Sequence, residues 1–162
     1  MRKTETKVEF WLKKNDSEDF DRNSVEQQLN IVFTDSKSPR VGKGVLNCED
    51  IEEARKDMPG VTILSSDTPP YKMLLHAYLK LAFPRVVSTS LDASSDMLME
   101  FIRGKELQIV NICKEYGLFA CVVFRIYASF DNLPVISLRE DVIKTLSAIN
   151  VSVDFDLQLD AD

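Results

Sequence analysis

Hydrophobic and polar positions alternate most regularly at the end of the chain. Between residues 151 and 159 every second residue is apolar, and the residues between them are polar or acidic. A period of two is typical of a β-strand with one buried and one solvated face. The pattern therefore predicts a final strand over 151–159, with Val153, Phe155 and Leu157 facing the core.

Two other segments have strand-like patterns over a longer stretch. Residues 7–13 alternate, with Trp11 on the otherwise polar side, which indicates a half-buried strand. Residues 119–129 are apolar at nearly every position, as expected of a central strand covered on both faces. Shorter apolar runs predict strands at 61–64 and 133–136.

A spacing of three or four between apolar residues predicts amphipathic helices elsewhere. Ser137 and Glu140 have the spacing of a capping box, so a helix should begin at Leu138 and stop near Asn150. Gly104 interrupts the longest apolar stripe, which indicates a kink or two consecutive helices. The predicted helices are a short one through Val25 and Leu29 after an Asp21 or Asn23 cap, and others near 49–56, 69–83, 95–116 and 138–149.

Together these elements predict an α+β fold, with a mixed or mainly antiparallel sheet covered by amphipathic helices mainly on one face. The chain has 162 residues and contains no repeat, low-complexity tract or linker, so we expect a single domain over 1–162. At this length folding buries about 70% of the surface that the unfolded chain exposes, which is enough for a substantial core.

The charge balance narrows the classes of partner. Twenty basic and 26 acidic residues give a net charge of −6, which opposes binding to nucleic acid and to anionic membranes. No stretch approaches the roughly 20 apolar residues that span a bilayer, and the first residues lack the apolar core of a signal peptide. We expect a cytoplasmic protein. The negative charge would favour a basic protein partner, although it also serves solubility.

The side chains that usually carry nucleophilic catalysis are few. Cys113 and Cys121 fall at positions predicted to be buried, where thiols are inert, and three cysteines cannot all pair within one chain. His76, the only histidine, falls between Lys72 and Lys80 on the polar face of the predicted 69–83 helix. A solvated surface histidine is the favoured interpretation, which argues against Ser-His-Asp or Cys-His catalysis.

The one constellation with possible chemistry is the pair Asp154 and Asp156. They lie on the same face of the predicted final strand, about 7 Å apart. Such a pair could form part of an acidic docking surface, or could hold a divalent cation with a third ligand. Alternatively, the two carboxylates only keep the strand soluble and discourage edge pairing, neutralised by Arg125 on a neighbouring strand.

Three further residues are possible binding residues. Trp11 could mark a binding surface, although shielding by a neighbouring loop or long side chain is the commoner explanation. Arg40 and Lys43 make the segment before Gly44 locally basic. The segment lacks the glycine spacing of a phosphate loop, and the sequence predicts no cofactor site. The acidic run 49–53 suits the first turn of a helix better than a metal site.

Several of these motifs carry a resemblance to a bacterial family, the domain of unknown function 4279. They are Asp19-Phe20-Asp21, the segment from Pro39 to Gly44, the run from Pro134 to Leu138, and the terminal run from Ala148 to Leu157. The resemblance covers nearly the whole chain and implies an α+β fold. The family brings no established activity.

These observations leave three functional hypotheses. The leading one is a non-enzymatic cytoplasmic protein-binding module, of which an immunity-type inhibitor of a basic toxin is one concrete version. The second is a metal-dependent hydrolase using Asp154 and Asp156. The third is a structural homo-oligomer that associates through Trp11 or an exposed apolar helix face. The sequence leaves the oligomeric state and the partner's identity open.

Overall fold

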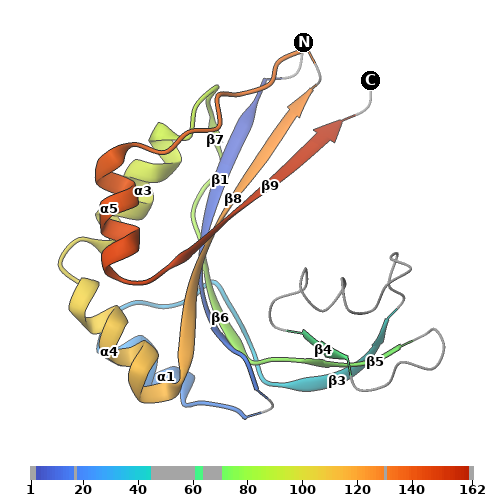
Figure 1. Cartoon of the computed structure of the whole chain (residues 1–162), viewed down its shortest axis with the longest axis vertical. Helices are drawn as coiled ribbons and strands as arrows, with labels where there is room; N and C mark the ends of the chain where they lie inside the picture. Colours follow the sequence, from blue (N-terminus) through green and yellow to red (C-terminus); the bar gives the residue numbers. More distant parts are fainter. Residues whose placement is uncertain (1–2, 17, 45–60, 64–70, 130, 161–162) are drawn as a thin grey trace.

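The computed structural model describes residues 3–16, 18–44, 61–63, 71–129 and 131–160. These residues form two β-sheets and a set of helices (Figure 1). The elements in chain order are β1 (Glu5–Lys14), α1 (Arg22–Leu29), β2 (Asp35–Lys37), β3 (Arg40–Gly44), β4 (Val61–Ile63), β5 (Tyr71–Leu75), β6 (Tyr78–Ala82), β7 (Val86–Val87), α3 (Asp92–Ile102), α4 (Glu106–Tyr116), β8 (Leu118–Ser129), α5 (Glu140–Ala148) and β9 (Ser152–Asp160).

The main sheet has the strand order β2-β6-β1-β8-β9, and β7 also pairs with β1. β1 runs antiparallel to β6, β7 and β8, whereas β8 and β9 are parallel and are joined through α5. The smaller sheet has the order β3-β5-β4 and is antiparallel. The fold is therefore α+β with a mixed, mostly antiparallel main sheet, as the sequence predicted.

The helices pack on one face of the main sheet, and the smaller sheet lies on the other side, near one end (Figure 1). The core between sheet and helices is made by alternate residues of the two longest strands, because every second side chain of a strand points to the same face. These residues meet the buried stripes of the helices. The core includes Val8, Phe10, Leu12, Val122, Phe124, Ile126, Leu98, Ile102, Ile109, Ile112, Val142 and Leu146.

Several local predictions are confirmed. Asp21 caps α1 by accepting a hydrogen bond from the Ser24 amide at 3.1 Å. Gly104 separates α3 from α4, and Gly117 ends α4 in the left-handed conformation with φ 62°. Asn150 follows α5 in the same conformation with φ 53°. Asparagine and glycine tolerate this conformation best, so the sequence identified these stops from residue type alone.

The predicted helix over 69–83 is wrong. Residues 71–75 and 78–82 form the strands β5 and β6, and the latter pairs with both β1 and β2. Residues four apart share one face of a strand as well as one face of a helix, so the apolar spacing fitted both structures. Pairing with β1 decided the outcome, because it buries Leu79 completely.

His76 is consequently placed differently from the prediction. It lies between β5 and β6 with only 7% of its surface exposed, not on a solvated helix face. Its Nδ1 is 3.0 Å from the carbonyl oxygen of Lys14. A ring nitrogen held by a backbone carbonyl fixes the imidazole in the packing between the strands. His76 is therefore a buried histidine, not a solvated one.

The capping box at Ser137 and the strand at 133–136 are also wrong. α5 begins at Glu140, its N-cap is Arg139, and no side chain caps the first amides. Arg139 instead forms an ion pair with Asp96 of α3 at 2.7 Å and another with Asp141, in the first turn of α5, at 3.1 Å. The first of these pairs links the start of α5 to α3. Residues 133–136 form no strand, since only Val135 makes an isolated bridge to Ser90.

A few predictions fall outside the described residues. They concern the helix and acidic run at 49–56 and the first two residues of the predicted 69–83 helix; Cys48, the third cysteine, also lies outside the described residues. The predicted strand at 61–64 is confirmed for Val61–Ile63. Within the described ranges, no helix is both long and apolar enough to cross a membrane.

Candidate functional site: a charged face of the main sheet

The main-sheet face opposite the helices brings together most of the candidate residues. Direct cross-strand register aligns Lys7 of β1 with Arg125 of β8 and Asp156 of β9. The next row aligns Glu9 with Val123 and Asp154. We call the surface made by Lys7, Glu9, Arg125, Asp154 and Asp156 the charged face.

Glu9 is the centre of the charged face and is almost fully buried, with 3% exposure. Its carboxylate accepts hydrogen bonds from Lys7 Nζ at 2.9 Å and Trp11 Nε1 at 3.2 Å, and Arg125 Nε lies 3.2 Å away. Burial alone would raise the pKa of the Glu9 carboxyl, but the hydrogen bond from Lys7 and the charge of Arg125 outweigh it. The pKa therefore lies below its ordinary value, and Glu9 stays ionised.

Arg125 links Glu9 to β9, because its Nη1 also donates to the Asp156 carboxylate. Gln158 Nε2 donates to the same Asp156 oxygen at 3.2 Å. The interpretation of Arg125 as a neighbouring-strand partner is thus confirmed for Asp156. Arg125 therefore already neutralises this carboxylate.

Asp154 is held differently from Asp156. Its one partner among the described residues is the Cys121 thiol, with Sγ 3.2 Å from Oδ2. Burial is the largest effect and raises the pKa of the Cys121 thiol; the Ser152 hydrogen bond and the Lys13 charge lower it in part, and the nearby Asp154 carboxylate raises it further. Cys121 therefore remains a neutral hydrogen-bond donor, and Asp154 is an exposed carboxylate without a cation beside it in the described part of the chain.

Trp11 lies on the same face as these residues but is covered by its neighbours. The Tyr78 ring is 5.0 Å from it, and the amines of Lys13 and Lys80 lie 4.8 and 5.2 Å from its ring centroid. Both amines are within the range of cation–π attraction. Shielding by long side chains, the commoner explanation for an aromatic at this position, is confirmed.

The two basic candidates do not join the charged face. Arg40 and Lys43 belong to β3 of the smaller sheet, where they pair in register with Leu75 and Lys72. The sequence did not show that these two residues and Trp11 belong to different sheets, because sheet membership depends on pairing between strands that are distant in the chain. Their strand therefore belongs to a different sheet from β9.

The apolar side of β9 is less buried than predicted. Phe155, Leu157 and Leu159 retain 45, 41 and 37% exposure, whereas Phe124 and Ile126 beside them on β8 are fully buried. The Phe155 ring stacks on that of Phe124, with centroids 5.7 Å apart. β9 is the last strand of the sheet, so its apolar residues have a packing neighbour on one side only.

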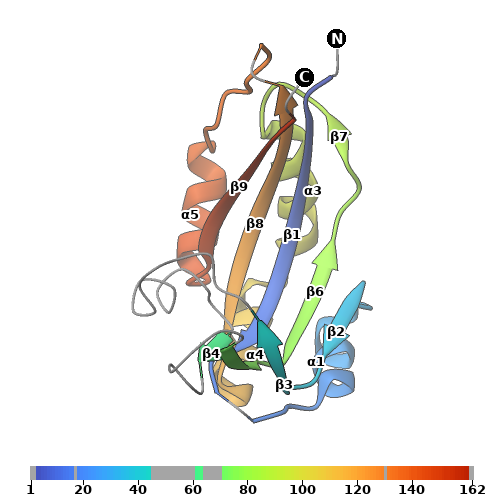
Figure 2. The same cartoon turned by 90° about the vertical axis from the view of Figure 1, so that its right-hand side faces the viewer.

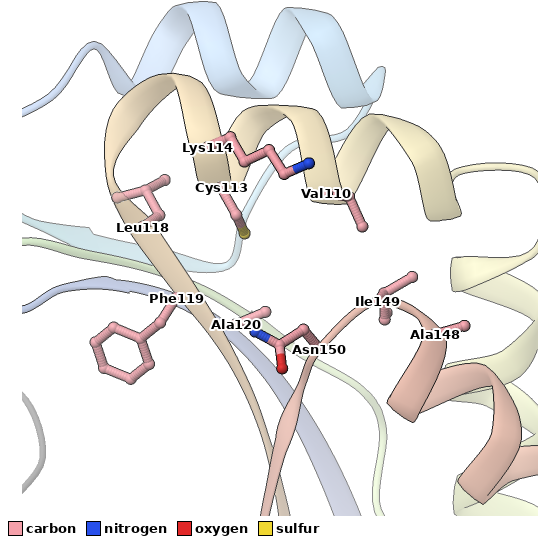
Figure 3. A pocket seen from close by; sticks show the side chains of 9 residues that line it. All are labelled: Val110, Cys113, Lys114, Leu118, Phe119, Ala120, Ala148, Ile149 and Asn150. Atoms are coloured by element: carbon pink, nitrogen blue, oxygen red, sulfur yellow. The ribbon is translucent and has the colours of Figure 1, made fainter.

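A separate hollow of about 240 Å³ lies between the end of α4, the start of β8 and the α5–β9 turn (Figure 3). Apolar side chains make most of its wall, with Lys114, Cys113 and Asn150 as the polar groups. Burial raises the pKa of the Cys113 thiol to about 11, so it is protonated at neutral pH and a poor nucleophile. The hollow thus offers packing space but no activated group.

The charged face includes residues that sequence reasoning did not single out. Glu9 and Lys7 were visible only as polar positions of an alternating strand, and nothing in the sequence shows that three strands align them with Arg125 and Asp156. The one available signal for Glu9 was its position as an acidic residue between apolar neighbours in a strand. No group of three or more His, Cys, Asp or Glu side chains suited to a metal ion occurs among the described residues.

No family model, curated protein or solved structure matches the chain. The resemblance to the domain of unknown function 4279 therefore stays a prediction. Functional inference rests on the geometry of the charged face and of β9.

Proposed function

We propose that the protein is a non-enzymatic cytoplasmic binding module that engages a basic partner protein through Asp154 and Asp156 of β9. The observation that supports this most directly is the state of Asp154, an exposed carboxylate whose partner among the described residues is a neutral thiol. Its neighbours Glu9 and Asp156 already have cations. A cationic group on a partner would supply the missing charge.

The balance of charge on this face points the same way. Within the five residues of the charged face, two cations, Lys7 and Arg125, stand against three carboxylates, Glu9, Asp154 and Asp156, while Lys13 and Lys80 lie farther along the sheet over Trp11. The excess is negative, as is the net charge of −6 for the whole chain. Both accelerate encounter with a basic surface and resist an acidic one. An immunity-type inhibitor of a basic toxin is one concrete form of this proposal.

The test is an affinity capture from lysate of the source cells, read by mass spectrometry, with wild-type protein beside the Asp154→Asn/Asp156→Asn variant. A matched control is Glu100→Gln/Glu115→Gln, which removes two charges from exposed positions of α3 and α4 in the helix layer. We expect a basic protein that is retained by wild type and by the helix-layer control but is lost from the β9 variant and at high salt. Equal recovery with all three proteins would contradict the proposal.

The metal-dependent hydrolase is the alternative, and it uses the same pair of carboxylates. It requires a cation to bind at Asp154, or at Asp156 beside Arg125, with further ligands that the described residues do not supply. It predicts that a divalent cation raises the melting temperature and that Asp154→Asn abolishes the rise. A thermal-shift series with Mg²⁺, Mn²⁺, Ca²⁺ and Zn²⁺ separates it from the binding module.

A further inference from the structure

β9 forms one end of the main sheet, and its outer edge is unpaired within the described part of the chain. It is nine residues long and pairs in register with β8 from Cys121↔Ser152 to Ser129↔Asp160. No described residue outside the β8 ladder makes a backbone hydrogen bond to it. Such an edge presents a row of backbone donors and acceptors that can pair with a further strand.

The opposite end of the sheet offers much less. β2 has only three residues, Asp35–Lys37, and two of them are exposed polar residues. Short, polar edge strands are the usual protection against unwanted pairing. β9 is three times as long, so it is the edge of this sheet that can hold another strand in register.

The helix layer continues past the edge of β9. In Figure 2, α5 stands beyond β9 on the side away from β8. Ile143 on the outer side of α5 is 53% exposed. A hollow of about 270 Å³, lined by Leu138, Ile143, Leu146, Ser147, Asn150, Val151 and Val153, lies between α5 and the start of β9. A strand added to β9 would therefore lie on an existing apolar support.

The residues on the two faces of β9 indicate which side chains the added strand should carry on each face. Phe155, Leu157 and Leu159 are partly exposed on the helix side, where apolar residues of a neighbour would cover them. On the other side Asp154 is exposed and Asp156 is half-exposed, so basic residues would pair there. Apolar and basic residues must alternate, because neighbouring residues of a strand point to opposite faces.

A second copy of this chain does not meet that requirement. Antiparallel pairing of two β9 strands about Phe155 would place Asp154 of each copy opposite Asp156 of the other. Like charges directly opposite each other are destabilising. The acidic residues of β9 thus disfavour pairing with the β9 edge of a second copy and favour pairing with a strand that carries basic residues.

We propose that the edge of β9 binds an extended segment of a basic partner protein, with alternating apolar and basic residues, as an added strand of the main sheet. This rests on the proposed function and specifies its mode of recognition. The partner's backbone pairs with β9, its apolar residues lie over α5, and its basic residues reach Asp154 and Asp156.

The test uses the full-length protein and a blocked nine-residue peptide in which lysine and valine alternate, with binding measured by calorimetry. One control peptide has the same composition with lysines and valines in separate blocks. A second has the original sequence with every backbone amide methylated, so that it cannot donate ladder hydrogen bonds. Because several hydrogen bonds are lost, we expect the methylated peptide to bind at least about tenfold more weakly than the alternating one.

Two further measurements locate the bound peptide. Amide hydrogen exchange of residues 152–160 should slow when the alternating peptide binds, and the Asp154→Asn/Asp156→Asn variant should bind it more weakly than the Glu100→Gln/Glu115→Gln control. No binding of the alternating peptide overturns the inference. Equal binding of the alternating, block and methylated peptides also overturns it, but a loss of that binding in the β9 variant would leave the proposed acidic docking function standing.

Discussion

At the scale of single residues, Glu9 shows how a buried carboxylate becomes part of a stable sheet. Its side chain is 3% exposed, a position that would be unfavourable for an unpaired charge. Donors from Lys7, Trp11 and Arg125 surround it. The structure thus depends on Glu9 being ionised, and its stability should depend on pH through this group.

The pH prediction follows from the lowered pKa of Glu9. A carboxyl whose pKa is lower in the folded than in the unfolded protein stabilises the fold above its unfolded value, near 4.5, and loses that contribution as the pH falls through the folded value. Glu9→Gln should therefore flatten the dependence of the free energy of unfolding on pH below about 4.5. Near neutral pH it should destabilise by about 1–3 kcal/mol, because hydrogen bonds to a charged group are lost.

Urea unfolding of wild type and variant between neutral and acidic pH measures both effects. Glu100→Gln is the matched control, since Glu100 is exposed on α3 and its substitution should change stability by less than about 0.5 kcal/mol. Parallel pH profiles for wild type and Glu9→Gln would show that Glu9 is not the linked group.

At the scale of elements, α5 is the crossover that makes β8 and β9 parallel. One of its faces is buried through Val142 and Leu146, while Ile143 on the other side is 53% exposed. The helix is thus attached to the sheet by a narrow stripe.

Two alanine substitutions on α5 should separate its two faces. Leu146→Ala leaves a cavity under the helix and should cost about 2–5 kcal/mol. Ile143→Ala should cost less than about 0.5 kcal/mol, because the side chain has little to lose in the free protein. Equal losses measured by chemical denaturation would mean that the outer side of α5 is covered in solution.

The left-handed glycine at the end of α4 leads to a second prediction about a helix. Gly117 has φ 62°, and a Cβ there would meet only the Lys14 amine at an ordinary 3.8 Å. The cost of Gly117→Ala should therefore come from the backbone alone, about 1–2 kcal/mol for a left-handed alanine. Ser147→Ala, at an exposed position of α5, is the control and should be nearly neutral by thermal unfolding.

At the scale of the whole molecule, the main sheet has helices on one face and the charged face on the other, with β9 as its long edge. The homo-oligomer hypothesis requires Trp11 or an exposed apolar helix face. Trp11 is covered by its neighbours, but Ile143 of α5 is exposed, as are the apolar residues of β9. The charges of β9 oppose association of two copies, because two-fold pairing brings carboxylates together.

We accordingly expect a monomer at micromolar concentration by light scattering. The Asp154→Asn/Asp156→Asn variant should associate more strongly than wild type, since it lacks the opposing charges but retains Phe155 and Leu157. A stable wild-type dimer that is unaffected by this variant would support the homo-oligomer instead.

The sequence by itself determined the features that depend on neighbours along the chain. Alternation identified β1 and β9, a continuous apolar run identified β8, and residue type placed the stops at Gly117 and Asn150. These signals are local, because the alternation of a strand depends on successive residues, and tolerance of the left-handed conformation depends on the residue type alone.

Tertiary structure decided what depends on pairing between distant segments. It converted the expected helix at 69–83 into β5 and β6, buried His76, and placed Arg40 and Lys43 on a second sheet. It also aligned Glu9 with Asp154 across β8, and left β9 at an edge with its apolar side half-exposed. Strand order and register are set by the packing of the whole sheet, so no local pattern contains them.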